Sequence, residues 1–457
     1  MHRRAFLASS VALASQAGRV RAETDDLRAA AREGWLYSLP LIETARRRAD
    51  AGAAGIDAFV PGRRAEPGPG EVSAPEPDLL TASAWLNVGA GGAARLRVPD
   101  TTGRYASVTL MDMYGNVLGV FGSGARGDGG GDFTILGPPA RVGVAGYTVP
   151  EPRMPTLRRV VKARTPWVWA LVRVQASGEG GAEAARGLRD AFQVEVKAEG
   201  ARAPAPSVAP NAGWGDYFFA AQKLIEENPP PAYEADFFRR IAPLQLGAAG
   251  GFEKARFADA DLDQIQAGVG EARILAADLQ AGDGVEAGWS WPKAGVGDYG
   301  QDFLLRARTA FSALGAPTTD QLLTLRAAPP EGGLAFAAGP HYRLTLPGPP
   351  PVDGLWTLAL YEVAPDGRLF PTANPIDRYA LGSGASSLRR RPAGEIDVWI
   401  GPDDPGGAHT SNWLPSPTVG RFALTLRAYL PKPELLARQY RPPPVELLAR
   451  APPPSRR

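Results

Sequence analysis

Two acidic residues and a tyrosine offer the most reactive side chains in this sequence. Asp112 ends an apolar, strand-like run, Tyr114 follows two residues later, and Asp78 lies in an earlier polar segment. Two carboxylates about 5–10 Å apart across one cleft could serve as acid and base, or as nucleophile, in glycoside cleavage. With Arg378 binding a substrate carboxylate, these residues predict a hydrolase or lyase that acts on a small polar or saccharide substrate.

A second group of residues has ligand-binding rather than catalytic chemistry. Asn374, Arg378 and Tyr379 lie in a polar loop between expected strands, and Trp413 lies in a later loop, where an indole can stack on a sugar. Arg104 adds a cation to the polar segment that precedes the expected strand ending at Asp112. Two interpretations of Arg378 stay open, because an arginine in such a loop either binds a carboxylate or donates to backbone carbonyls of the loop itself.

The scarcity of metal-binding and nucleophilic side chains limits the chemistry further. The chain has no cysteine and three histidines, of which His2 lies at the extreme N-terminus. Thiolate metal sites and thiol nucleophiles are excluded, and His341 and His409 are too few for a tri-histidine zinc site. We therefore expect neither a metal nor a cofactor.

Composition indicates a globular protein with a loop-rich β structure. The 457 residues suffice for two or three domains, and 54 glycines and 45 prolines favour many turns. A net charge of +2, from 50 basic and 48 acidic side chains, gives no basic footprint for nucleic acid. After the N-terminal segment there is no apolar run of transmembrane length.

The first 22 residues have the pattern of a twin-arginine export signal. Arg3 and Arg4 precede Phe6 and a short, weakly apolar run, and cleavage after Ala22 would leave the mature chain. The run is too short to span a bilayer. We expect the twin-arginine export machinery to be a partner and the periplasm to be the destination.

The remaining chain divides into four expected parts and a tail. Residues 23–197 are expected to form an N-terminal β-sandwich that starts with a helix from Asp25 or Asp26 to about Arg48, whose basic last turn is solvated. Residues 198–213 form a Pro/Ala-rich linker. Residues 214–334 form a helical segment, with helices near 216–227, 234–242, 261–279 and 301–314. Residues 335–430 form a C-terminal jelly-roll β domain, and 431–457 form a Pro-rich arm. The fold class is mainly β with a helical insert, with two sandwich or jelly-roll modules.

A short repeat relates the two β regions. Residues 105–112 align with 355–362, with a hydroxyl at the third position, Leu at the sixth and an acid at the eighth, and each region has a later apolar strand carrying one arginine, Arg173 or Arg427. Since an unpaired buried charge is costly, Asp112 and Glu362 are expected to pair with these arginines. The alternative is that both acids lie at the mouths of pockets.

Several motifs in this order resemble the paired bacterial domains of unknown function numbered 1254 and 1214. The motifs are Trp35–Ile42, Ser83–Leu86, Pro99–Tyr105, Leu110–Tyr114 with Asn116, Gly131–Phe133 and Thr165-Pro166 in the first half, and Gly297–Gly300, Arg306-Ala307, Leu355–Tyr361, Asn374–Ala380, Asn412–Pro415 and Phe422–Arg427 in the second. The resemblance implies two β-sandwich or jelly-roll modules joined by a helical segment, often exported and often oligomeric, with no established reaction.

Two segments depart from that family pattern. Where the family reads Thr-Pro-Asn-x-Asp-Thr-x-Tyr, residues 74–81 keep only Pro75 and Asp78, and the polar segment before the last β module is reduced to 326–331. If the first motif lines a site in relatives, that site is altered here.

Three functions remain open at this point. The first is an exported, cofactor-free protein that binds a small molecule or saccharide, or associates with the envelope, through a pocket near the junction of the two β modules. The second is the carboxylate-dependent hydrolase or lyase described above. The third is a structural homo-oligomer in which the Pro-rich tail wraps a neighbouring subunit.

Overall fold

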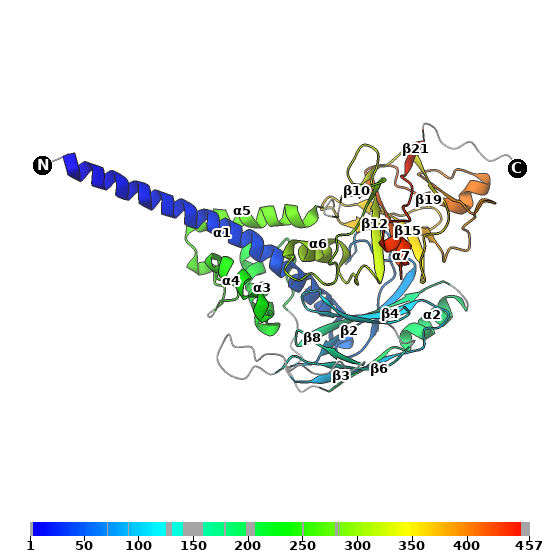
Figure 1. Ribbon diagram of the computed structural model, residues 1–457, viewed down its shortest axis with the longest axis horizontal. Helices are drawn as coiled ribbons and strands as arrows, with labels where there is room; N and C mark the ends of the chain where they lie inside the picture. The colour runs from blue at the N-terminus through cyan, green and yellow to red at the C-terminus, as the bar shows by residue number, and fades with distance from the viewer. Residues whose placement is uncertain are drawn as a thin grey trace.

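The chain folds into two β-sandwiches and a helical layer, as the sequence predicts. A computed structural model describes residues 3–70, 72–89, 91–124, 130–139, 159–177, 180–197, 206–248, 251–278, 282 and 284–448, with side chains from Asp26 onward. Four sheets form two pairs, and helices from three parts of the chain pack together beside the first pair (Figure 1). The predicted class, mainly β with a helical insert, is confirmed.

The N-terminal sandwich consists of a five-stranded and a four-stranded sheet. In spatial order, the first contains β1 (Val60–Pro61), β2 (Leu79–Asn87), β8 (Trp167–Gln175), β4 (Ala106–Asp112) and β5 (Val117–Gly122); the second contains β7 (Val160–Lys162), β6 (Gly131–Leu136), β3 (Ala93–Val98) and β9 (Gln193–Lys197). Helix α2 (Gly181–Asp190) precedes β9.

Strand β4 is buried along its whole length because both of its faces are covered. Ala106, Val108 and Leu110 belong to the core between the two sheets. Met111, on the other face, packs with the helical layer, as do Trp85 and Trp169, whose rings stack 5.1 Å apart. Strands buried on both faces are apolar throughout rather than alternating.

The C-terminal sandwich has the same two-sheet plan. Its larger sheet contains β10 (Val285–Glu286), β11 (Trp289–Ser290), β12 (Leu322–Ala327), β20 (Arg421–Tyr429), β15 (Trp356–Val363) and β16 (Leu369–Phe370), with β13 (Phe336–Ala337) beside β20 and β17 (Ala380–Gly382) beside β15. Its smaller sheet contains β19 (Trp413–Pro415), β18 (Ile396–Gly401), β14 (His341–Leu346) and β21 (Glu446–Leu448), which follows α7 (Pro433–Leu436) near the chain's end.

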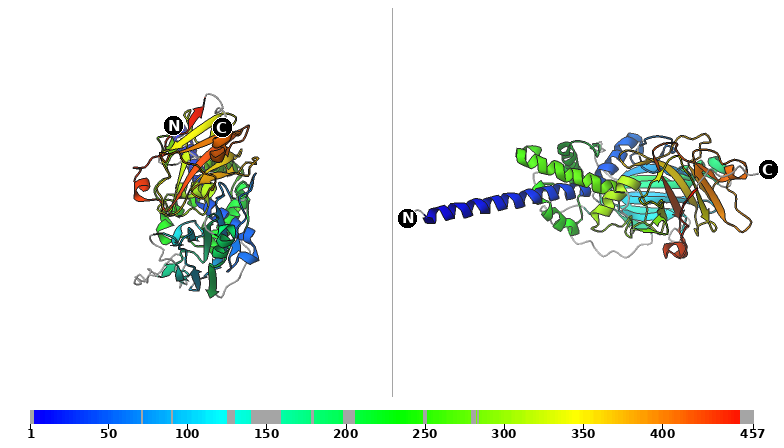
Figure 2. Two further views of the ribbon diagram at one scale, coloured as in Figure 1. Left: turned by 90° about the vertical axis from the view of Figure 1, so that its right-hand side faces the viewer. Right: turned by 90° about the horizontal axis from the view of Figure 1, so that it is seen from above.

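The helical layer joins the start of the chain to its middle. Helix α1 (Arg3–Ala51) lies along α5 (Asp259–Ala277) and contacts α3 (Trp214–Glu227) and α6 (Phe303–Ala313); α4 (Ala235–Arg240) follows α3 (Figures 1 and 2). These helices correspond to the predicted ones, but α1 begins at Arg3 rather than near Asp25. Its Pro40 lies inside the helix.

The basic last turn of α1 is not a solvated helix end, so that prediction is wrong. Arg48 is only 2% exposed and forms an ion pair with Glu227 at 2.8 Å, and its guanidinium lies 4.1 Å from the centre of the Trp167 ring. A carboxylate and an aromatic face together satisfy a cation that the amphipathic pattern alone would place in water.

The repeated octapeptides occupy equivalent strands. Strand β4 pairs antiparallel with β8, and β15 pairs antiparallel with β20. In both pairs the hydroxyl at the third position lies directly opposite the arginine, Ser107 opposite Arg173 and Thr357 opposite Arg427. The repeat is therefore architectural, and it places one arginine of each module at a corresponding position.

Candidate functional site

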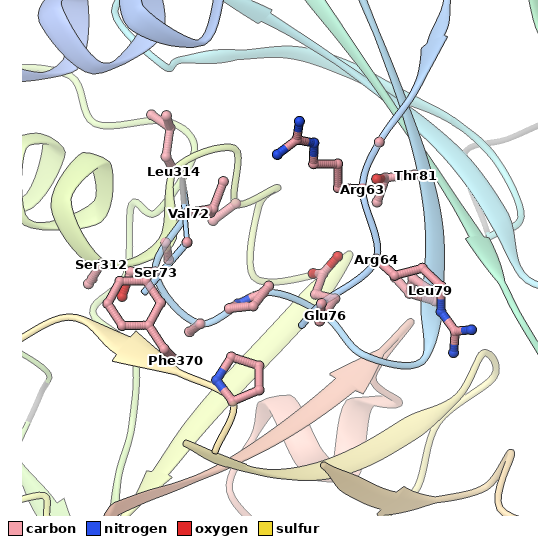
Figure 3. A pocket seen from close by; sticks show the side chains of 18 of the residues that line it. Arg63, Arg64, Val72, Ser73, Glu76, Leu79, Thr81, Ser312, Leu314 and Phe370 are labelled. Carbon is pink, nitrogen blue, oxygen red and sulfur yellow. The ribbon is translucent and has the colours of Figure 1, made fainter. Parts of the chain in front are cut away.

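A cavity of about 610 Å³ lies between the two sandwiches. Its walls come from β2 and β8 of the first module, from β12 and β20 of the second, and from the end of α6. The connecting segment 62–76 runs along it (Figure 3). Ligand sites for small molecules usually have about 300–1,000 Å³, so this cavity has the appropriate size.

The connecting segment is fixed to the second module by its backbone. The Ala74 N–H donates to the Leu369 carbonyl at 2.7 Å, and the Leu369 N–H donates to the Ser73 hydroxyl at 3.0 Å. Ala74 has a φ of 51°, a left-handed conformation that costs a non-glycine residue of order 1 kcal/mol. Such a conformation persists where the surrounding contacts determine it.

The arginine of the first module holds the segment through a buried ion pair. Arg173 donates from Nε to Glu76 Oε2 at 3.0 Å and from Nη2 to the Gly315 carbonyl at 2.8 Å. Burial alone would raise the pKa of Glu76, but the charges of Arg173 and Arg427 outweigh it and hold that pKa below its ordinary value. Glu76 is therefore ionised and serves to anchor the segment.

The arginine of the second module holds the same segment from the other side. Arg427 donates to the Ala74 carbonyl and to the Tyr361 hydroxyl, both at 2.6 Å. That hydroxyl in turn donates to the Pro75 carbonyl at 2.7 Å. The two repeated arginines thus converge on one short stretch of chain between the modules.

The predicted pairing of these arginines with the acids of the repeat is wrong. Asp112 is 1% exposed and accepts hydrogen bonds from the backbone N–H groups of Tyr114 and Asn116, each at 2.9 Å, and from the Asn116 amide at 2.9 Å. Glu362 is exposed at the end of β15. Asp112 closes a tight turn with local donors, and Glu362 reaches solvent, so neither needs an arginine.

The lining of the cavity carries a large excess of positive charge. Two glutamates face seven arginines there: Glu66 and Glu76, against Arg46, Arg47, Arg63, Arg64, Arg173, Arg326 and Arg427. Burial and the neighbouring Arg427 lower the pKa of Arg326 to about 10, which still leaves it protonated at neutral pH. A concave site with one sign of charge concentrates ligands of the opposite sign.

Charged and apolar side chains both line the cavity. Arg63 and Arg64 are exposed at the start of the connecting segment, with Leu79 near Arg64, whereas Val72, Leu314 and Phe370 lie at the other side (Figure 3). The cavity therefore offers both cationic and apolar contact surface.

The residues predicted to be catalytic do not line this cavity. The carboxylate of Asp78 accepts from the Thr357 hydroxyl at 2.5 Å, and the hydroxyl of Tyr114 donates to the Asn228 carbonyl at 2.7 Å within the helical layer. Burial raises the pKa values of both Asp78 and Asp112. The structure does not bring Asp78, Asp112 and Tyr114 together with Arg378 in one cleft.

The residues predicted to bind a ligand mostly hold loops. Arg378 donates to the carbonyls of Thr410 and Trp413 at 2.9 and 2.8 Å, which is the loop-holding interpretation of this residue. The Asn374 side chain bonds the backbone of the same loop, and the Tyr379 hydroxyl bonds Asp377.

Two further predicted binding residues also make backbone contacts. The Trp413 indole is 3% exposed and donates to the Gly401 carbonyl at 2.9 Å. Arg104 donates to the carbonyls of Gln175, at 2.7 Å, and of Ser177. The side chains of Arg3 and Arg4 lie outside the described residues.

The described part of the chain contains no group of three or more His, Asp or Glu side chains placed to hold a metal ion. Within the same part, no helix has the length and apolar character needed to cross a membrane.

Sequence reasoning missed most of the cavity, although some of its signals were visible. Residues 74–81 and 326–331 are the two segments that depart from the family pattern, and Ala74, Glu76, Leu79, Thr81 and Arg326 all line the cavity. The altered motifs therefore mark the site. The cavity position of Arg63 and Arg64 could not be predicted, because nothing in the surrounding Pro/Gly-rich sequence indicates which surface these residues contact.

Comparisons with known proteins support the fold and leave the chemistry open. Residues 56–196 match the family model described as protein of unknown function DUF1254, and residues 323–433 match the model described as protein of unknown function DUF1214. No curated protein sequence matches the chain.

Two solved structures are similar to this chain. The VPA0106 protein from Vibrio parahaemolyticus is 16% identical with a TM-score of 0.61, over 92% of this chain and 100% of that one. An uncharacterised protein from Burkholderia cenocepacia is 12% identical with a TM-score of 0.45, over 98% of each chain. The first of these similarities supports the same overall fold.

Proposed function

We propose that this protein binds a small anionic molecule in the cavity between its two β modules. The modules match the family models DUF1254 and DUF1214, both described only as proteins of unknown function, so the proposal comes from the cavity itself. This is a cofactor-free binding function. The carboxylate-dependent hydrolase or lyase is not proposed, because its acids lie apart.

The observation that carries the proposal is the lining of the cavity by seven arginines and two glutamates. Three of these arginines have carboxylate partners, since Arg46 pairs with Glu43, Arg47 with Asp50 and Arg173 with Glu76. The other four still outnumber Glu66, so the lining keeps a positive excess. Arg64 is exposed on the connecting segment, where its charge can attract an anion from solution. A neutral saccharide would gain little from this excess, whereas an acidic one would gain from it.

Anions should therefore stabilise the protein more than their neutral counterparts do. Thermal unfolding would be measured with benzoate against benzamide, galacturonate against galactose, and inorganic phosphate, each over a range of concentrations. A bound anion should raise the melting temperature by a few degrees at high saturation. The proposal fails if no anion stabilises the protein more than its neutral counterpart does.

A charge reversal at the open side of the cavity tests the electrostatic part of the proposal. Arg64→Glu should weaken binding of the best anion about tenfold at low ionic strength, and less in high salt, because exposed charges are screened. Arg390→Glu is the matched control, since Arg390 is also exposed and lies outside the cavity. Equal losses in both variants would indicate a non-specific effect of net charge.

We also propose that the protein works in the periplasm after export by the twin-arginine machinery. Arg3 and Arg4 before a short, weakly apolar run support this route. Replacing both with lysine should leave the protein in the cytoplasm, as measured by fractionating cells that express the full chain. Normal periplasmic yield of this variant would refute the assignment. Assembly into a homo-oligomer stays a prediction.

A further inference from the structure

One wall of the cavity carries a side chain pair whose polar atoms are not used by the fold. Strands β12 and β20 are antiparallel neighbours, with Arg326 directly opposite Thr425 and Thr324 directly opposite Arg427. Alternate residues of a strand share a face. Arg326, Thr425 and Arg427 therefore project from one face of the sheet, and all three line the cavity.

The two arginines on this face differ in how they are satisfied. Arg427 donates to Tyr361 and to the Ala74 carbonyl. The side chain of Arg326 is half-buried, and among the described residues it has no hydrogen-bond or ion-pair partner. The positive charge of the neighbouring Arg427 repels that of Arg326. Arg326 is thus a partly desolvated cation that forms no ion pair within the part of the chain that the structure describes.

The hydroxyl opposite Arg326 is fully buried and unsatisfied. Thr425 is 1% exposed, and its Oγ1 has no hydrogen-bond partner within the described ranges. Buried polar groups in folded proteins are nearly always paired, so an exception requires an explanation. This hydroxyl lies beside Arg326, directly opposite it on the adjacent strand, and both residues line a cavity large enough to hold a ligand.

A purely structural role does not account for this arrangement. A structural arginine would have an acidic or carbonyl acceptor, as Arg173 has in Glu76 and Gly315 in the same cavity. Arg326 instead adds repulsion, which destabilises the fold. Proteins keep such unfavourable groups where function uses them.

We propose that Arg326 and Thr425 form a subsite that binds a carboxylate group of the ligand. A planar guanidinium presents two parallel N–H groups that match the two oxygens of a carboxylate, and the Thr425 hydroxyl supplies a third donor. One carboxylate balances one unpaired guanidinium. A phosphate dianion would bring a second charge, for which Arg427 is already engaged. This inference rests on the proposed function, because it names the chemistry of the same cavity.

The subsite is tested by calorimetric titration of the mature protein with benzoate, phenyl phosphate and benzamide. Arg326→Gln removes the charge and keeps a polar side chain, and Thr425→Val removes the hydroxyl at nearly constant shape. Benzoate should bind about 10- to 100-fold more weakly to the first variant and about 3- to 10-fold more weakly to the second, as expected for charge-assisted and neutral hydrogen bonds. Arg390→Gln, outside the cavity, should not change the affinity.

A second readout separates a binding role from a structural one. Without ligand, Arg326→Gln and Thr425→Val should melt at the wild-type temperature or above it, because the first removes a charge repelled by Arg427 and the second removes an unsatisfied hydroxyl. Arg173→Gln should melt lower, because it breaks the ion pair with Glu76. Lower melting of both subsite variants would overturn the inference.

The possible binding results also have distinct meanings. Equal benzoate affinity in wild type and Arg326→Gln overturns the subsite and leaves anion binding in the cavity intact. Arg326-dependent binding of phenyl phosphate without binding of benzoate overturns the carboxylate assignment. If no anion binds the wild type, the proposed function itself fails.

Discussion

Replacing Glu234 with alanine should lower the free energy of unfolding by about 3–5 kcal/mol, because it leaves a buried arginine without its counter-charge. Glu234 and Arg306 are 2% and 1% exposed, with Oε1 and Nη1 3.3 Å apart. The Tyr37 hydroxyl donates to the other carboxylate oxygen at 2.6 Å. Urea unfolding followed by tryptophan fluorescence measures the loss.

The surroundings of Arg306 explain why its charge is tolerated only with Glu234 present. Its guanidinium lies 4.7, 5.1 and 4.8 Å from the ring centres of Tyr37, Tyr114 and Phe303, and its Nε and Nη2 have no hydrogen-bond acceptor among the described residues. Aromatic faces attract a cation but do not replace a carboxylate. The pair joins α6 to the turn before α4, and Tyr37 connects it to α1, so its loss loosens the helical layer.

A surface pair and a double replacement give the controls. Glu446→Ala removes the partner of Arg343. The two charged groups are 2.7 Å apart, but Glu446 is 55% and Arg343 32% exposed, so the free energy of unfolding should fall by about 1 kcal/mol or less. The double variant Glu234→Met/Arg306→Met should be less destabilised than Glu234→Ala, because it leaves no buried charge unpaired. A loss of 1 kcal/mol or less in Glu234→Ala would contradict the argument.

The sequence predicts those parts of the fold that depend on local pattern. The alternating and apolar runs at 106–112 and 356–363 indicate strands, and their match predicts two related modules, which the equivalent pairing of β4 with β8 and of β15 with β20 confirms. The helices at 214–227, 259–277 and 303–313 follow from apolar periodicity and from acidic residues near their starts. Local physics determines these elements.

Partner choice for charged side chains could not be predicted in the same way. The apolar face before Asp112 indicates a buried acid, and that much is correct, but the acid is satisfied by Tyr114 and Asn116 two and four residues away. Conversely, Arg173 finds Glu76 almost a hundred residues earlier in the chain. Spacing along a strand shows which face a charge occupies and contains no information on which distant loop crosses that face.

The cavity depends on several such non-local contacts at once. The cavity is lined by segment 62–76 and by strands β8, β12 and β20, which come from both sandwiches. Between the modules an apolar cluster packs together: Leu79, Tyr105, Leu322, Leu355, Tyr429 and Leu430. In the sequence, Arg326 is one residue of a shortened polar segment. The binding role that we propose for it could be inferred only from its position opposite Thr425 in the cavity.

Glu76→Gln should make the protein less stable by about 3 kcal/mol at pH 7, and this difference should shrink as the solution is acidified. Glu76 is 14% exposed and Arg173 is 5% exposed, so glutamine leaves a buried arginine without charge compensation. The folded-state pKa of Glu76 lies below its ordinary value of 4.5. The ion pair therefore contributes its full stabilisation above about pH 4.5, and this contribution is lost as the pH falls through the lower folded-state value.

Glu66→Gln is the matched control, because Glu66 lies exposed on the same segment and in the same cavity. Its unfolding free energy should stay within about 0.5 kcal/mol of the wild type at both pH 7 and pH 4. Trypsin adds a local readout, since loss of the Glu76 anchor frees the chain around Arg63 and Arg64 and should speed cleavage there without unfolding either sandwich. A constant difference between wild type and Glu76→Gln from pH 7 down to pH 3 would show that the contact stabilises by shape and hydrogen bonding alone. Arg173 would then hold the segment through its hydrogen bonds to residue 76 and to the Gly315 carbonyl, and its positive charge would be uncompensated in the cavity.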